Sequence, residues 1–347
     1  MRAAVLEQVG RMVIKEVPDP GCPAGGLLLR IGACAVCGTD IKVYRHGHRF
    51  IVPPRITGHE LAGTVVEVGK GVRGFAVGDR VACAAVVPCG ECYYCRRGIQ
   101  GMCDDLRAMG YHYDGGFAPY MAIPERAVRN GCVNKVPDRL SLEEAALAEP
   151  LACCVNGQEL CDIRPGHTVA VVGAGPIGCM HVELARSQGA TKIILIDISE
   201  ERLKMSSFVE PDVSVNSSKE DPIEAVMGAT EGRGADVVIV ACSSGKAQEQ
   251  SLSLVAKRGV VDFFGGLPKD RPCIQFDSNL IHYREFKVVG NTGSSPQQNE
   301  VALRLLGAGK VRAARLISHR FPVEKTIEAI ETAERGEGLK VIVCPAE

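Results

Sequence analysis

Between about residue 165 and residue 290, short runs of Val, Ile and Leu alternate with helix-like segments. The strand-like runs are TVAVV, KIILID, DVSVN, ADVVIVAC, GVVDFFG and FKVVGN. Continuous apolar strands separated by helices are typical of a parallel sheet that is covered on both faces. Six such strands predict a complete doubly wound α/β fold for this part of the chain.

The residues before this alternation predict a different architecture. They contain short β-type runs, such as LLLRIGAC and GTVVEVG, which Gly and Pro interrupt. This pattern predicts a compact, mostly antiparallel, barrel-like unit. A helix is expected in SLEEAALAEPLACCVNGQELC, where Ser141 and Glu144 can form a capping box. We expect the tail from about Ser295 to return and complete this first unit.

A length of 347 residues favours two domains. We therefore expect a barrel-like domain at 1–152 and 296–347, and a nucleotide-binding domain at 153–295. The net charge of −1 gives no reason to expect a nucleic-acid partner. No apolar run is long enough to span a bilayer, and the first residues lack a signal-peptide core. These features predict a cytoplasmic protein without a membrane partner.

A glycine-rich turn follows the first strand of the α/β region and opens a helix. It reads Gly173-Ala174-Gly175-Pro176-Ile177-Gly178. The first glycine suits a tight turn, the second lets the backbone approach pyrophosphate, and the third allows close helix–strand contact. The helix N-terminus then offers free N–H groups to phosphate. The turn therefore predicts a dinucleotide site.

The second strand of this region ends at Asp197, where a carboxylate can accept hydrogen bonds from the adenosine ribose. A carboxylate there opposes a 2′-phosphate, so NAD is expected rather than NADP. Arg202 is a further candidate for cofactor binding, although its spacing also fits a solvated helix residue.

Four cysteines are closely spaced in PCGECYYCRRGIQGMC, at Cys89, Cys92, Cys95 and Cys103. Four thiolates can bind Zn²⁺ tetrahedrally, and such a closed shell leaves no position for substrate. We predict a structural zinc lobe at about 88–104. An alternative is a zinc-ribbon module that binds nucleic acid, but the chain lacks the basic footprint this requires.

A second metal site is expected from three distant segments, which contain Cys37, His59 and Glu149. One thiolate, one imidazole and one carboxylate can hold Zn²⁺ and leave a fourth position open, as catalytic zinc sites do. Glu60 is a possible extra ligand. The other cysteines are expected to be small buried hydrophobic residues.

Over nearly its whole length the chain resembles the zinc-dependent medium-chain dehydrogenases. The motifs that carry the resemblance are CGTD, the G-H-E-x-x-G segment, GDRV, the four-cysteine lobe and GAGPIG. It is most similar to the polyol (sorbitol-type) and threonine dehydrogenase branch, because Glu149 in EPL takes the place of a second thiolate. The resemblance implies a GroES-like catalytic domain, a Rossmann domain, and homodimers or homotetramers joined through the Rossmann sheets.

The resemblance also implies that Zn²⁺ and NAD together oxidise a small alcohol, with Thr39 taking the hydroxyl proton and passing it through the nicotinamide ribose to solvent. Several relatives carry histidine three positions later, where this chain has Lys42. A lysine is a poor proton acceptor near neutral pH. Three explanations are open. The surroundings of Lys42 lower its pKa, or Lys42 binds cofactor or substrate oxygens, or the proton leaves through water.

The carboxylate-rich metal site favours a polyol, sugar alcohol or sugar acid that binds through two oxygens, with Glu60 leaving the metal as substrate arrives. Tyr44, Tyr93, Phe117 and Glu149 are candidates to line the pocket from the catalytic half, with Asn291 to Ser295 approaching from the far side. One alternative is the oxidation of an amino alcohol such as L-threonine. Another is a zinc-free relative of the quinone-reductase or crystallin type, which would have no need for the metal ligands.

Overall fold

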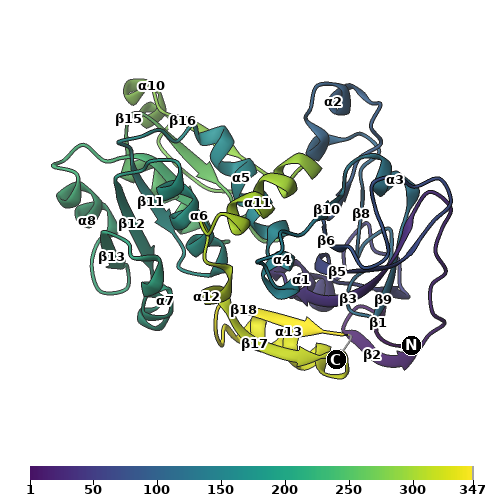
Figure 1. Ribbon diagram of the computed structural model, residues 1–347. Helices are drawn as coiled ribbons and strands as arrows, with labels where there is room; N and C mark the ends of the chain where they lie inside the picture. Colours follow the sequence, from purple (N-terminus) through teal and green to yellow (C-terminus); the bar gives the residue numbers. More distant parts are fainter. Residues whose placement is uncertain (346–347) are drawn as a thin grey trace. The chain divides into compact units, whose positions relative to one another are not determined.

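The computed structural model describes residues 1–345, which form two compact units (Figure 1). The first contains Met1–Ala152 together with the residues from Gly293 onward, and the second contains Cys153–Thr292. No helix among the described residues is both long enough and apolar enough to cross a bilayer.

The second unit is built on a six-stranded parallel sheet with strand order β13-β12-β11-β14-β15-β16. The strands are β11 (Thr168–Val172), β12 (Lys192–Asp197), β13 (Val213–Asn216), β14 (Ala235–Val240), β15 (Val255–Phe263) and β16 (Lys287–Gly290). The order reverses between β11 and β14, as in a dinucleotide-binding fold. The predicted doubly wound sheet is confirmed.

Helices connect these strands, as parallel pairing requires. They are α6 (Pro176–Ser187), α7 (Glu200–Met205), α8 (Pro222–Ala229), α9 (Gly245–Leu254) and α10 (Asn279–Arg284), with a 3₁₀ turn η2 (Ser206–Val209). The central strands are almost fully buried, which explains their continuous Val/Ile/Leu runs.

One carboxyl group is buried in this sheet without a partner. Asp262 in β15 is fully buried, and neither carboxylate oxygen has a hydrogen-bond partner within residues 1–345. Gly157 packs against it so closely that a Cβ there would lie 2.8 Å from Asp262 Oδ2 and 2.3 Å from Asn291 Nδ2. Burial raises the pKa of Asp262 to about 7.

The first unit is mostly antiparallel, as predicted, and matches a GroES-like architecture. Its main sheet has the order β10-β6-β5-β3-β18-β17, with β9 also paired to β3, and a second sheet has the order β2-β1-β4. The strands are β1 (Arg2–Gln8), β2 (Arg11–Glu16), β3 (Leu27–Ala35), β4 (Arg55–Ile56), β5 (Glu60–Val68), β6 (Arg80–Cys83), β7 (Val86–Val87), β8 (Arg107–Ala108), β9 (Tyr120–Ile123), β10 (Val133–Lys135), β17 (Ile317–Pro322) and β18 (Lys340–Cys344).

The helices of this unit are short. They are α1 (Gly38–His46), α2 (Tyr93–Arg96), α3 (Glu125–Arg129), α4 (Leu142–Ala146), the start of α5 (Ala148–Cys161), α11 (Pro296–Gly307), α12 (Ala313–Leu316) and α13 (Thr326–Arg335), with 3₁₀ turns η1 (Gln100–Met102) and η3 (Val323–Lys325). Strand β18 pairs with β3 through Ile342 and Val343, so residues that follow the second unit in the chain complete the main sheet of the first unit.

The helix expected after Ser141 is divided into α4 and α5. Ser141 caps α4, and its capping box with Glu144 is present as predicted. The division at Leu147 follows from Pro150, which has no N–H to donate to the carbonyl of Ala146. A proline is tolerated only in the first turn of a helix, so a new helix begins just before it.

Candidate functional site: two metal centres and a nucleotide cavity

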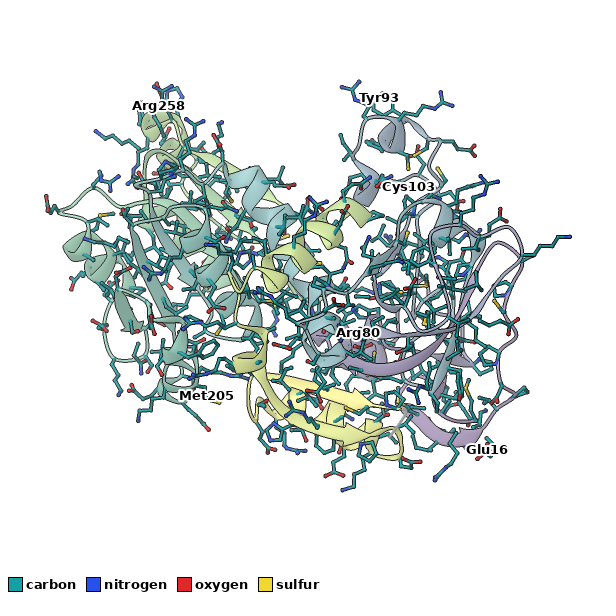
Figure 2. All side chains as sticks on the ribbon, viewed as in Figure 1. Glu16, Arg80, Tyr93, Cys103, Met205 and Arg258 are labelled. Carbon is teal, nitrogen blue, oxygen red and sulfur yellow. The ribbon has the colours of Figure 1, made fainter. Side chains whose placement is uncertain are left out.

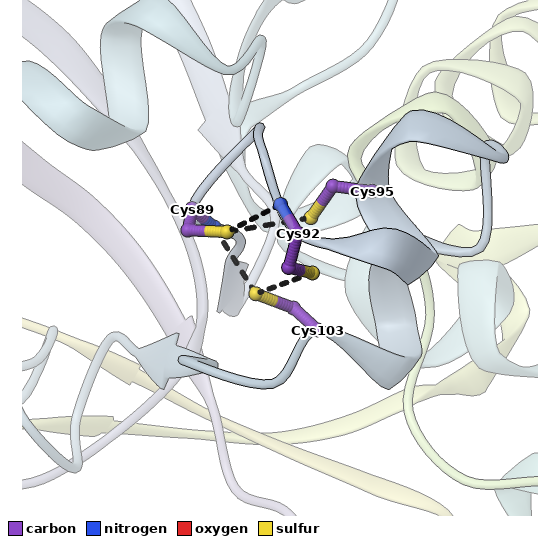
Figure 3. Close-up of side chains that lie close together, drawn as sticks. All are labelled: Cys89, Cys92, Cys95 and Cys103. Carbon is purple, nitrogen blue, oxygen red and sulfur yellow. Dashed lines mark hydrogen bonds between the residues drawn. The ribbon is translucent and has the colours of Figure 1, made fainter.

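The four cysteines of the predicted lobe converge on one point (Figure 3). The Sγ atoms of Cys89 and Cys95 are 3.9 Å apart, as are those of Cys92 and Cys103. Four sulfurs at about 2.3 Å from one ion at tetrahedral angles lie about 3.8 Å from each other. The cysteines therefore fit one Zn²⁺ ion, and all four are free thiols rather than disulfides.

The backbone around the lobe favours thiolates. The N–H groups of Glu91 and Cys92 donate to Cys89 Sγ, at 3.4 and 3.3 Å. Backbone N–H groups of Cys95 and Asp104 lower the pKa of Cys92 to about 6. Metal binding requires deprotonated sulfur, so these donors prepare the lobe for its ion.

A second group of ligands is formed by Cys37, His59 and Glu60. Their ligand atoms all lie within 4.8 Å of one another. His59 and Glu60 are 5% and 1% exposed, whereas Cys37 is half-buried. A thiolate, an imidazole and a carboxylate are a donor set typical of zinc, so these residues fit the ion that the sequence predicts.

Local structure places each of these side chains. Cys37 is the N-cap of α1, and its backbone N–H donates to Asp40 Oδ2 at 2.9 Å. The other oxygen of Asp40 lies 3.6 Å from His59 Nδ1. Asp40 is buried, and this contact favours a proton on Nδ1, which leaves Nε2 for the metal. Sequence analysis missed Asp40, although it lies in the CGTD motif.

The turn before β5 is held by close packing. Gly58 has φ +90°, a conformation that favours glycine, and a Cβ there would lie 2.7 Å from Cys34 Sγ. His59 follows this turn and Glu60 is the first residue of β5. The two ligands are therefore held at the closely packed junction between this turn and β5.

Glu149 lies near this cluster but outside the group of mutually close ligand atoms. It is the second residue of α5 and is 7% exposed. Burial raises the pKa of the Glu149 carboxyl to about 7, with opposing effects from the charges of His59 and Glu60. The structure therefore places Glu149 in the same electrostatic environment as His59 and Glu60.

Two residues that sequence analysis missed also belong to this environment. The ring of Tyr111 lies 5.4 Å from that of His59, and burial raises the pKa of the Tyr111 hydroxyl. Lys340, in β18, has its Nζ 2.5 Å from Glu60 Oε2. Nothing near Lys340 in the sequence indicates this contact, because its partner Glu60 lies 280 residues earlier in the chain.

Of the three aromatic candidates to line the pocket, two are core residues and the third lies on the surface. Phe117 is fully buried and Tyr44 is 9% exposed, both within the hydrophobic core of the first unit. Tyr93, labelled in Figure 2, is 63% exposed on the cysteine lobe. Their aromatic character alone could not distinguish a core position from a pocket.

The glycine-rich turn has the geometry expected of a phosphate-binding loop. Gly173 has φ +112°, and a Cβ at Gly178 would lie 1.8 Å from the oxygen of Gly173. Gly175 is the N-cap of α6, and a Cβ there would meet open space. Pro176 is in the first turn of the helix, followed by Ile177. The open N-terminus of α6 therefore fits a pyrophosphate group.

Asp197 stands at the end of β12, beside this turn. Its two carboxylate oxygens accept from the N–H groups of Ala174 and Ser199, at 2.7 and 2.8 Å. It lines a cavity of about 340 Å³ together with Gly173 and Lys246, within the second unit. Arg202 is in α7 and is not among the residues that line this cavity.

Comparison with known families agrees with this geometry. Residues 23–137 match the family described as "Alcohol dehydrogenase GroES-like domain". Residues 176–308 match the family described as "Zinc-binding dehydrogenase". The ligand set that a zinc-free relative would not need is present in the chain.

Curated relatives align over nearly the full length. The L-threonine 3-dehydrogenase of Pyrococcus furiosus is 36% identical over 97% of this chain and 95% of its own length. The sorbitol dehydrogenase of Halalkalibacterium halodurans is 33% identical, with all of both chains covered.

Solved structures also align with nearly the whole chain. A protein from Sinorhizobium meliloti 1021, whose structure was determined as a candidate zinc-binding dehydrogenase bound to NADP, has a TM-score of 0.92 and 34% identity, covering 99% of both chains. A structure from Escherichia coli CFT073, described as a short chain alcohol dehydrogenase complexed with NADH, has a TM-score of 0.89 and 26% identity, covering 99% of both chains.

The two metal centres, the phosphate-binding turn and the full-length relatives lead to one assignment. The chain belongs to the zinc-containing medium-chain alcohol dehydrogenase family and is a zinc-dependent oxidoreductase that acts on small alcohols.

Proposed function

We propose that this protein oxidises a secondary alcohol of a polyol, sugar alcohol or sugar acid, with NAD as the hydride acceptor. The observation that carries the proposal is the ligand cluster of Cys37, His59 and Glu60, with Glu149 in the same environment. A site rich in carboxylates suits a substrate that offers several hydroxyl groups. The similarity to a sorbitol dehydrogenase supports this substrate class.

Cys37, His59 and a carboxylate would hold Zn²⁺, which would supply a Lewis acid for the substrate hydroxyl. NAD supplies the acceptor for the hydride. Thr39 is half-buried on α1, two residues after Cys37, and we assign it the task of accepting the hydroxyl proton while its own proton passes through the nicotinamide ribose to solvent. Lys42 is exposed on the same helix, which supports a role in binding oxygen atoms or an exit of the proton through water.

We also propose that NAD is preferred over NADP. Each carboxylate oxygen of Asp197 accepts one backbone N–H and retains a lone pair for a ribose hydroxyl. The same fixed negative charge opposes a 2′-phosphate. Relatives of known structure bind either cofactor, so kcat/KM must be compared for the two. Equal values for NAD and NADP would contradict the preference.

A substrate panel tests the reaction. Sorbitol, galactitol, inositol, L-threonine and 2-propanol are each supplied with NAD, and NADH formation is followed. We expect the highest kcat/KM for a polyol. If kcat/KM is instead highest for L-threonine, the amino-alcohol alternative is favoured. The similarity to the 36% identical L-threonine 3-dehydrogenase supports that alternative.

Two cysteine variants provide matched controls for the metal. Cys37→Ser is expected to lose activity and one of two zinc ions per chain. Cys273→Ser removes an exposed thiol from the second unit and is expected to retain both ions and full activity. Full activity in Cys37→Ser would refute the proposed site.

The remaining proposals concern the cellular compartment and the oligomeric state. We propose a cytoplasmic homotetramer or homodimer. The sixteen cysteines are all free thiols, which supports a reducing compartment.

A further inference from the structure

The second unit contains another cavity, which the nucleotide-binding residues do not line. Its volume is about 370 Å³, and basic side chains line it together with two aspartates. This volume is within the range of about 300–1,000 Å³ that small-molecule sites occupy. The charged lining residues are Arg164, His167, Lys257, Arg258 and Lys287, with Asp162 and Asp236.

This cavity lies at the edge of the parallel sheet opposite to the nucleotide cavity. His167 directly precedes β11, Asp236 is the second residue of β14, and Lys287 is the first residue of β16. Gly173, by contrast, follows the carboxyl end of β11, and Asp197 ends β12. A parallel strand of five residues such as β11 is about 16 Å long, so a phosphate group bound at one edge is separate from a ligand at the other.

An irregularity in β15 forms one wall of the cavity. The register of β15 with β14 shifts between Val255 and Val260, so residues 256–259 bulge from the ladder. Bulges redirect side chains and are frequent beside functional sites. Gly259 suits this bulge because a Cβ there would lie 2.7 Å from the backbone oxygen of Asp236.

Two charged residues of the lining have a left-handed backbone. Arg258, which lies in the bulge and is labelled in Figure 2, has φ +61°, and Asp162 has φ +51°. This conformation is strained for residues other than glycine, and such strain is frequent at ligand sites. The chain therefore keeps two charged side chains at positions where glycine would be less strained.

The aspartates of the cavity already have partners. Asp162 forms an ion pair with Arg164. Asp236 Oδ1 lies 2.6 Å from a guanidinium nitrogen of Arg233, and Asp236 Oδ2 accepts the N–H of Thr168 at 2.7 Å. Neither carboxylate is therefore available to neutralise the lysines.

Lys257 and Lys287 are the uncompensated cations of the lining. Both are exposed, and neither forms an ion pair within residues 1–345. His167 Nδ1 accepts the backbone N–H of Arg164 at 3.3 Å, so the ring hydrogen is on Nε2 and adds a donor. The cavity thus offers two ammonium groups and a ring N–H for an anion.

We propose that this cavity is a second anion site, which binds a small molecule through its phosphate group, with Lys257 and Lys287 contacting the phosphate oxygens. A phosphate ester carries a charge of about −1.5 to −2 at pH 7, so it matches two ammonium groups better than a single carboxylate does. The net charge of −1 does not favour a polyanion such as nucleic acid. The site goes beyond the proposed function, because it does not depend on which alcohol is oxidised.

The test uses the full-length, zinc-loaded protein with NADH bound, so that the nucleotide cavity is occupied. Inorganic phosphate is titrated in about 0.1 M KCl, where charges more than about 10 Å away are largely screened, and the ³¹P NMR line width reports binding. In wild type we expect saturable binding of one phosphate per chain. In Lys257→Met and in Lys287→Met we expect Kd to rise about 10-fold, because each variant loses a hydrogen bond to a charged group.

Lys269→Met is the matched control. Lys269 is an exposed lysine of the same unit that does not line the cavity, and we expect its variant to bind phosphate as wild type does. All three variants remove one exposed positive charge, so we expect their Tm and their NADH fluorescence to equal those of wild type. A loss of phosphate binding is then separate from a loss of folding.

Three results would overturn the proposal. They are the absence of saturable phosphate binding in wild type, an unchanged Kd in either Lys257→Met or Lys287→Met, and an equal rise in Kd in Lys269→Met. Vesicles that contain phosphatidic acid provide a second arm of the test. Binding to these vesicles that depends on Lys257, without binding of free phosphate, would assign the cavity to a lipid headgroup instead.

Discussion

Replacing Asp262 with asparagine is expected to change how the stability of this protein depends on pH. Asp262 is fully buried in β15, and neither of its oxygens is hydrogen-bonded within the described chain. Burial raises its pKa from 3.8 to about 7. The folded state therefore retains a proton that the unfolded state releases, and asparagine removes this difference without a large change in shape.

The sign and magnitude follow from proton linkage. Between the unfolded and folded pKa values, the folded state binds one more proton, so stability is full at low pH and falls as the pH rises towards 7. Each pH unit in that window changes the free energy of unfolding by about 1.4 kcal/mol. From about pH 5.5 to pH 7, wild type should lose about 2 kcal/mol relative to Asp262→Asn.

Differential scanning calorimetry of the zinc-loaded proteins measures the effect. A loss of about 2 kcal/mol corresponds to a Tm difference that grows by about 4–8 °C over this pH range. Asp270→Asn is the matched control, because Asp270 is 75% exposed in the same unit and should show no such trend. A pH dependence of Tm that is identical in wild type and Asp262→Asn would refute the reasoning.

Three further predictions concern the sites. Gly178→Ala places a Cβ 1.8 Å from the oxygen of Gly173, so we expect it to abolish the fluorescence change of NADH on binding, and a retained change would contradict the assigned turn. Cys92→Ser should lower the zinc content by one ion per chain and lower Tm, and an unchanged zinc content would argue against the lobe as a metal site. Asp40→Asn should release His59 and so lower the metal affinity or kcat about 10–100-fold, as measured by chelator competition and steady-state kinetics. Values equal to wild type would show that Asp40 does not orient His59.

The parts of the fold that the sequence predicts well are those in which one physical requirement acts on consecutive residues. A strand buried on both faces requires an uninterrupted apolar run, and KIILID and ADVVIVAC are such runs. The glycine-rich turn is equally local, because steric limits apply at Gly173 and Gly178 themselves. The four-cysteine lobe is also encoded in one short segment.

The rest could not be predicted because it depends on contacts between distant residues. Lys340 reads as the start of an apolar strand, and only the pairing of β18 with β3 brings it to Glu60. Asp262 likewise lies in an apolar run, with no sequence signal that its carboxyl lacks a partner. The prediction of a single helix after Ser141 is wrong because Pro150 lacks the backbone N–H that an unbroken helix needs at that position.

The late position of β18 in the chain has a consequence for synthesis on the ribosome. The second unit is one continuous segment and can fold as soon as it emerges. The β-rich unit must wait, because β18, the neighbour of β3, is translated only after the whole of the second unit. Until then the nascent protein lacks the lysine that pairs with Glu60, so a chain that stalls before β18 should be caught as a folded nucleotide-binding module tethered to an unfinished barrel.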